Sequence, residues 1–120
     1  MIEVTNLQQF KTILWKNGLG ETTELAINEN ASLDNFIWRL SIASVINDGL
    51  FSDFSGYHRN LVLISGKGIN LHHDEKSVDK LENILDIASF DGGCKTQGEL
   101  VAGAIRDFNI ITDKDRVIAK

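Results

Sequence analysis

Arg39 and Ser41 are the first side chains in this sequence whose types and spacing suit ligand binding. They lie two residues apart within residues 36–46, where an alternating pattern predicts a β-strand with both side chains on one face. A guanidinium offers a planar fork of donors that suits a carboxylate. We expect this face either to meet water or, if the sheet closes, to line an enclosed cavity. The opposite face is predicted to be the core face and carries Phe36, Trp38, Leu40 and Ile42.

Two other patterns could carry chemistry but favour structural roles. His72 and Asp74 alternate onto one strand face and could hold a metal, yet at a charged strand end we interpret them as solvated turn residues. Gly18 and Gly20 form a Gly-x-Gly pair that lacks a third glycine and precedes a strand instead of a helix. It therefore indicates a turn, not a phosphate-binding loop.

The elements that must position these residues are short and separated by glycines. The chain has ten glycines and no proline, so Gly, Asn and Asp must make the turns. Residues 2–14 fit either a short helix or an extended entry strand, and residues 22–27 fit a strand. Residues 61–64 and 69–73 are predicted to pair as a hairpin. Many short strands at this spacing predict an all-β antiparallel barrel or sandwich.

Length and charge narrow the classes of function. The 120 residues fit a single domain, residues 1–120. A net charge of −5 gives no electrostatic reason to bind nucleic acid or anionic lipid. No apolar run approaches the roughly 20 residues of a membrane span, so we expect no membrane association. Cys94 is the single cysteine and no signal peptide is recognisable, which predicts a cytoplasmic protein.

Six sequence blocks, in order, resemble the HutD/Ves family. They are Trp15-Lys16-Asn17-Gly18-x-Gly20-x-Thr22-x-Glu24-Leu25-Ala26, Trp38-Arg39-Leu40-Ser41-Ile42-Ala43, Asp48-Gly49-x-Phe51-Ser52-x-Phe54-x-Gly56-x-x-Arg59, Leu63-x-x-Gly66-x-Gly68, Phe90-x-Gly92 and Asp107-Phe108-Asn109. The resemblance implies a cupin-like β-barrel of the RmlC-like jelly-roll type. It also implies a link to histidine utilisation in some members and to cold or stress response in others, with no established catalysis.

Members of that family usually continue for several dozen residues into a second lobe. The resemblance therefore predicts a short or C-terminally truncated member with an incomplete second lobe. An open sheet edge in such a chain would let it pair with a second copy.

The family pattern also implies a basic and polar pocket. Its predicted ligand-binding residues are Trp15, Lys16, Asn17, Trp38, Arg39, Ser41 and Arg59. We expect the two arginines to clamp a small anionic carboxylate metabolite, formylglutamate or a relative, with a regulatory or accessory role. The alternative is that Arg39 forms a structural ion pair with Glu24 or Asp107, and that the tryptophans are plain core.

Metal-dependent cupins normally present a His-x-His pair, of which Gly56-Tyr57-His58-Arg59 keeps one histidine. We therefore expect no metal, no other cofactor and no catalysis. Two other interpretations stay open. One is a metal-dependent enzyme that uses His58, His72 or His73, and the other is an interaction module completed by a partner lobe.

Overall fold

The computed structural model describes residues 11–15, 18–29, 31 and 35–115, and every regular element among them is a β-strand. The strands form a six-stranded sheet in the order β1-β2-β3-β10-β5-β8 and a four-stranded sheet in the order β4-β9-β6-β7. The strands of the first sheet are β1 (Lys11–Leu14), β2 (Gly20–Ile27), β3 (Trp38–Val45), β5 (Tyr57–Ser65), β8 (Ile87–Asp91) and β10 (Ile105–Asp113). Those of the second are β4 (Gly49–Leu50), β6 (Ile69–His73), β7 (Ser77–Leu81) and β9 (Thr96–Leu100).

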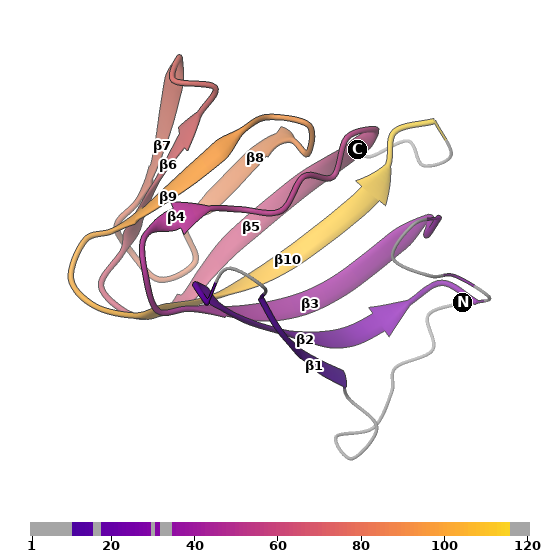
Figure 1. Ribbon diagram of the computed structural model, residues 1–120, viewed down its shortest axis with the longest axis horizontal. Coiled ribbons are helices and arrows are strands. Elements are labelled where there is room, and N and C mark those ends of the chain that lie inside the picture. Colours follow the sequence, from indigo (N-terminus) through magenta and orange to yellow (C-terminus); the bar gives the residue numbers. More distant parts are fainter. Residues whose placement is uncertain (1–10, 16–17, 30, 32–34, 116–120) are drawn as a thin grey trace.

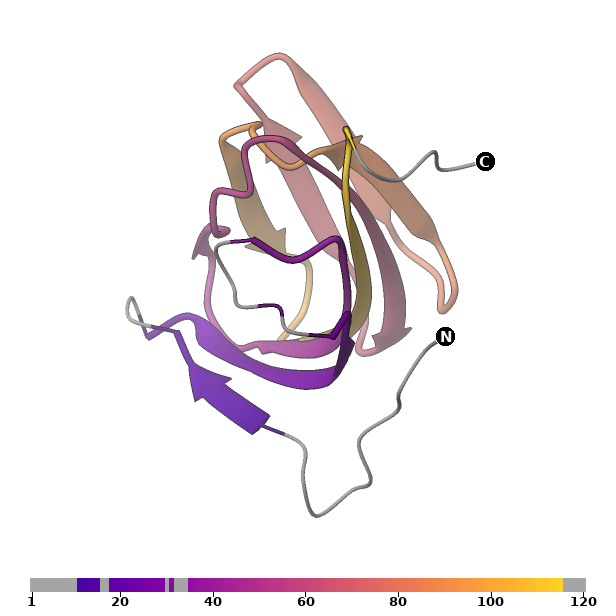
Figure 2. The same cartoon turned by 90° about the vertical axis from the view of Figure 1, so that its right-hand side faces the viewer.

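All neighbouring strands pair antiparallel. The six-stranded sheet is strongly curved and wraps towards the four-stranded sheet, so the two enclose a common interior (Figures 1 and 2). The prediction of an all-β antiparallel barrel or sandwich is confirmed. The strand prediction for residues 22–27 is also confirmed, and residues 11–14 take the extended alternative. The rest of the 2–14 prediction lies outside the described residues.

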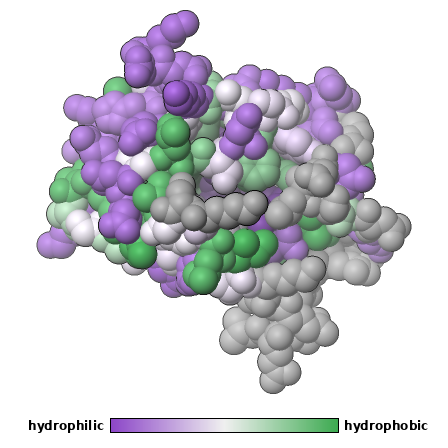
Figure 3. All heavy atoms as spheres, in the orientation of Figure 1, coloured by the Kyte–Doolittle hydropathy of each residue, from purple (hydrophilic) through white to green (hydrophobic). Residues whose placement is uncertain are grey.

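Part of the interior is apolar. Buried side chains from β3, β5, β6, β7, β8 and β10 form this core: Val45, Leu61, Leu63, Ile69, Leu71, Leu81, Ala88, Phe90 and Ile105. Figure 3 shows hydrophilic side chains gathered over the projecting β6–β7 end of the molecule. Within the described ranges, the chain contains no helix with the length and apolar character needed to cross a membrane.

The strand β3 faces the opposite way from our prediction. Its buried residues are Arg39, Ser41, Ala43 and Val45, whereas Trp38, Leu40 and Ile42 are half-buried on the outer face. On that outer face Ile42 lies opposite Phe108, and Leu40 lies opposite Ile110, so large apolar side chains partly cover one another there. The predicted core face is therefore wrong beyond Phe36, which is buried just before the strand.

The predicted hairpin of residues 61–64 and 69–73 is also wrong. β5 lies between β10 and β8 in one sheet, whereas β6 lies between β9 and β7 in the other. In the connection, Gly66 has a φ of +100° and Gly68 a φ of +128°. A Cβ on Gly66 would lie 2.6 Å from the Ile105 Cγ2, so glycine lets the chain cross between sheets at a tight corner.

Candidate functional site

The strand register brings Arg39 and Arg59 to the same level of the barrel. β10 lies between β3 and β5, and its Ile111 is paired with Arg39 on one side and with Arg59 on the other. Neighbouring strands lie about 4.8 Å apart, so the two arginines start roughly 10 Å from each other on the same inner face. Both are buried, with 4% and 6% of their surface exposed.

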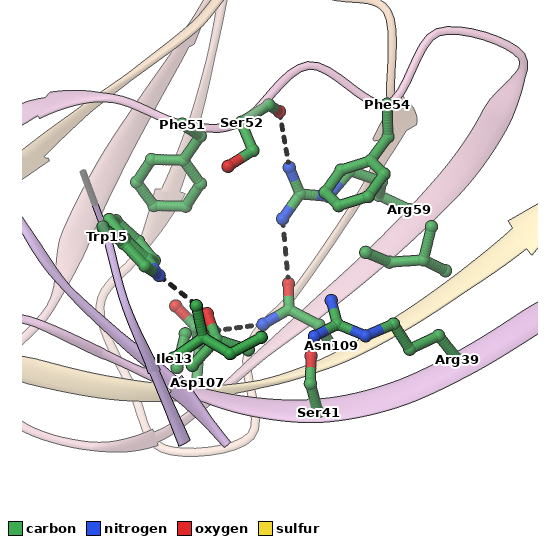
Figure 4. Close-up of a pocket in the computed structure, with 13 residues that line it drawn as sticks. Ile13, Trp15, Arg39, Ser41, Phe51, Ser52, Phe54, Arg59, Asp107 and Asn109 are labelled. Atoms are coloured by element: carbon green, nitrogen blue, oxygen red, sulfur yellow. Dashed lines mark hydrogen bonds between the residues drawn. The ribbon is translucent and has the colours of Figure 1, made fainter. Parts of the chain in front are cut away.

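A cavity of about 120 Å³ lies in the polar part of the interior, and Figure 4 shows the side chains around it. The strands supply Ile13, Thr22, Arg39, Ser41, Ala43, Arg59, Asp107, Asn109 and Ile111, Trp15 follows β1 directly, and the loop after β4 supplies Phe51, Ser52 and Phe54. The charged side chains of this lining, within the described residues, are two arginines and one aspartate. The barrel therefore encloses charge next to its apolar core, against which Trp15 and Phe51 of the lining also pack.

Arg39 makes an ion pair with Glu24 on β2. Its Nε donates to the Glu24 Oε1 at 3.0 Å, and both side chains are largely shielded from water. The alternative role of Arg39 as half of a structural ion pair is therefore present in the fold. The same guanidinium also lines the cavity, so the pair with Glu24 leaves Arg39 in a position to meet a ligand.

Arg59 lies in a cage of aromatic rings and amide oxygens. Its guanidinium carbon is 5.3 Å from the ring centroids of Phe54 and Phe90 and 5.9 Å from that of Phe51. The Nη1 donates to the Ser52 carbonyl at 3.4 Å, and the Nη2 donates to the Asn109 Oδ1 at 3.2 Å. The buried Nε finds no acceptor among the described residues.

Asp107 is the third charged residue of the cavity and is completely buried. Asn109 Oδ1 accepts from Arg59, which fixes the amide orientation because an arginine can only donate. The Asn109 Nδ2 therefore donates to the Asp107 Oδ1, at 2.5 Å. The other carboxyl oxygen, Oδ2, is buried and meets no donor within the described part of the chain.

Burial shifts the pKa of both groups. It lowers the pKa of Arg59 to about 10, with Asp107 opposing the shift and Arg39 adding to it, so Arg59 is still a cation at neutral pH. Burial raises the pKa of Asp107 to about 7, although the Asn109 hydrogen bond and the charge of Arg59 oppose this shift. Near neutral pH the cavity thus holds a permanent cation beside a carboxyl that titrates.

The other predicted pocket residues fall in different places. Trp15 lines the cavity, donates from its Nε1 to the Thr22 Oγ1 at 2.7 Å and packs edge-on against Phe51. Ser41 also lines the cavity. Trp38 alternates with Arg39 along β3 and lies on the outer face, so it does not share the cavity. Lys16 and Asn17 lie outside the described residues.

The histidines lie in separate surroundings. His58 adjoins Arg59 on β5, but alternation places it on the other face. His72 is half-buried on β6 and pairs with Glu99 at 3.4 Å. His73 is buried between the Thr96 hydroxyl and the Asp79 carboxylate, each 2.9 Å from a ring nitrogen. Over the ranges that the structure describes, no three or more His, Cys, Asp or Glu side chains cluster as they would around a metal ion.

Asp107 and Asn109 are site residues that our sequence reasoning did not select. They stand two apart on β10, between Ile105 and Ile111 on the same face. A pair of polar residues inside an otherwise apolar strand face was the available signal. The aromatic residues around Arg59 gave no such signal, because they come from a loop and from β8.

Comparison with known proteins identifies relatives along nearly the whole chain. The HutD family model matches residues 7–120. An uncharacterized 21.2 kDa protein in the hutC 3' region of Pseudomonas putida is 36% identical, over 99% of this chain and 62% of its own length. Protein Ves of Escherichia fergusonii is 34% identical, over 92% of this chain and 58% of its own length. The chain thus spans about three-fifths of these curated relatives.

Solved structures agree with this result. HutD from Pseudomonas fluorescens, described in a formate condition, superposes with a TM-score of 0.84 at 36% identity and covers 96% of this chain and 62% of that one. An RmlC-like cupin from Shewanella frigidimarina gives a TM-score of 0.66 at 10% identity, with 96% of both chains covered. The second likeness concerns the fold alone, and it confirms the cupin-like, RmlC-like class expected from the sequence.

Proposed function

This chain belongs to the HutD family, and on that basis we propose that its interior cavity binds a small carboxylate-bearing metabolite. The protein would then act in the cytoplasm as a regulatory or accessory binding factor. The proposal assigns no chemical step to the cavity. It assigns the anion-binding role to Arg39 and Arg59, supported by Asn109 and by the aromatic residues around Arg59.

One observation carries this proposal: Arg59, a buried and positively charged residue of the cavity lining, keeps one donor without an acceptor among the described residues. The Arg59 Nε is buried without an acceptor among the described residues. Burying a charged donor without a partner is costly, so an acceptor in the cavity would recover that cost. A carboxylate oxygen is the acceptor that best suits a guanidinium.

The size of the cavity limits what can bind inside it. Its volume of about 120 Å³ is somewhat smaller than a cavity of about 150 Å³ that holds benzene. A group of roughly six non-hydrogen atoms or fewer therefore fits. Formate, acetate and lactate are within this limit, whereas a larger acid such as N-formylglutamate would place only one end inside.

Binding is tested by measuring ligand-induced thermal stabilisation and calorimetric affinity with formate, acetate, lactate and N-formylglutamate. Arg59→Met removes the charge while keeping a long apolar side chain. We expect it to weaken binding by about 10- to 100-fold, as the loss of a charge-assisted hydrogen bond implies. Arg106→Met is the matched control, because Arg106 lies on β10 but is exposed on the outer face.

The outcomes separate the proposal from a general charge effect. Stabilisation of the wild type and of Arg106→Met, together with its loss in Arg59→Met, would support an arginine-lined anion site. If Arg59→Met does not fold, Arg59→Lys keeps the charge without the planar fork and should bind measurably more weakly than the wild type. Failure of all four acids to bind the wild type, or equal binding by every variant, would refute the site.

A further inference from the structure

Asp107 is an unusual neighbour for a site that binds anions. The carboxyl group is completely buried, lines the same cavity as Arg39 and Arg59, and has one oxygen without a donor among the described residues. An ionised carboxylate there would repel an incoming carboxylate at short range. A neutral carboxyl would instead offer one O–H donor.

The hydrogen bonds decide which oxygen carries that proton. Arg59 holds the Asn109 amide so that its Nδ2 donates to the Asp107 Oδ1. Oδ1 is therefore already an acceptor, and the proton of a neutral Asp107 belongs on Oδ2. This is the oxygen with which no described residue forms a hydrogen bond, so an O–H there has no acceptor among those residues.

The charge balance of the surroundings agrees with a neutral Asp107 in the liganded state. Charged groups face Asp107 from three other strands: Arg59 on β5, Arg39 on β3 and, behind Arg39, its partner Glu24 on β2. With Asp107 ionised, two carboxylates match two guanidinium groups and leave no net charge for a ligand. With Asp107 neutral, one positive charge is left over, which matches one monocarboxylate.

We infer that the cavity takes up a small carboxylate together with one proton, which is held on the Asp107 Oδ2 and donated as a hydrogen bond to the bound anion. This inference rests on the proposed function, since it requires that a carboxylate binds. Asp107 is then a specificity residue that donates a hydrogen bond to an acceptor on the ligand. Asn109 is a positioning residue that orients the Asp107 carboxyl group. Affinity for the carboxylate depends on pH as a result.

The size of that dependence follows from the titration of Asp107. Burial raises its pKa to about 7, so a binding-competent neutral form dominates at about pH 6 and is only a few per cent populated at about pH 8.5. The apparent Kd scales inversely with this population, so it should rise about 30-fold between the two pH values. Arg59 stays charged throughout, because its pKa is about 10.

The test is calorimetric titration of formate and of acetate into the full chain at about pH 6 and about pH 8.5. At the higher pH, the titration is repeated in two buffers of different ionisation enthalpy, which gives the number of protons bound per anion. We expect close to one proton per anion and the 30-fold weakening. Asp107→Asn mimics a permanently neutral side chain. The Kd of this variant should therefore differ less than about twofold between the two pH values, and its anion should bind without a proton.

Asp115→Asn, which removes the same charge at an exposed position, should behave like the wild type. Wild-type binding with no proton uptake and a constant Kd would overturn the inference while leaving the binding proposal intact. A failure of both acids to bind at either pH would overturn the proposed function and the inference together. If Asp107→Asn does not fold, the wild-type proton count and pH dependence decide the matter on their own.

Discussion

The buried carboxyl of Asp107 should make the stability of the ligand-free protein depend on pH. Its pKa is about 7 in the folded chain, against about 3.9 in an unfolded chain. Between these values the folded state binds more protons than the unfolded state, so the free energy of unfolding falls as pH rises. The contribution of Asp107 is complete below about pH 4 and is lost once the pH has passed about 7.

The magnitude follows from the distance between the two pKa values. At about 1.4 kcal/mol per pH unit, this group accounts for about 4 kcal/mol of stability at acid pH that is absent at pH 8. For a domain of this size, such a difference corresponds to a melting temperature lower by roughly 10 to 20 °C at the higher pH. Three exposed acids, Asp74, Asp91 and Glu99, have lowered pKa values. They therefore change the free energy of unfolding only at acid pH.

Urea unfolding of the wild type, Asp107→Asn and Asp115→Asn between about pH 5 and pH 8.5 measures this effect. The wild type and Asp115→Asn should lose stability with rising pH over this range. The curve of Asp107→Asn should be nearly flat by comparison, and the variant should be the most stable of the three at about pH 8. Parallel curves for all three proteins would refute our account of the buried carboxyl.

Two further predictions concern other parts of the chain. Gly20→Ala should lower the free energy of unfolding by more than about 2 kcal/mol, because a Cβ would lie 2.0 Å from the Ser44 carbonyl oxygen. At Gly18 a Cβ would meet no atom within 4 Å, but the φ of +74° disfavours alanine, so Gly18→Ala should cost about 1 kcal/mol. Urea unfolding measures both values. Burial raises the pKa of Cys94, and a hydrogen bond with Asp74 adds to the shift. Iodoacetamide should therefore modify Cys94 more slowly than it modifies a free cysteine. It should modify Cys94 faster in Asp74→Asn than in the wild type.

The sequence predicted where the strand containing Arg39 lies better than it predicted which face of that strand is buried. Alternation in residues 36–46 predicted a strand, and the structure has one. The choice of inner face failed because we assigned the more apolar face to the core, whereas here Arg39 points inward. That arrangement is stabilised by Glu24, which lies on another strand and accepts a hydrogen bond from Arg39, and a local pattern holds no information about such a partner.

The position of Arg59 also depends on contacts that a local sequence pattern does not contain. The sequence of residues 50–59 predicts a loop that carries three aromatic residues, but β5 already begins at Tyr57, so Arg59 lies in a strand. Its closeness to Arg39 depends on β10 lying between their strands, an order of strands that the periodicity of the sequence does not reveal. The ligand-binding roles of both arginines stay predictions.

The position of β10 in the middle of its sheet sets the order in which the site can be assembled. Asn109 is 50 residues beyond Arg59, with which it shares a hydrogen bond, and β10 must insert between two strands synthesised long before it. A nascent chain on the ribosome therefore holds its arginines without an enclosed pocket until residue 109 has emerged. Occupancy by an anion would then mark only chains whose long-range pairing is complete, and it would slow their unfolding.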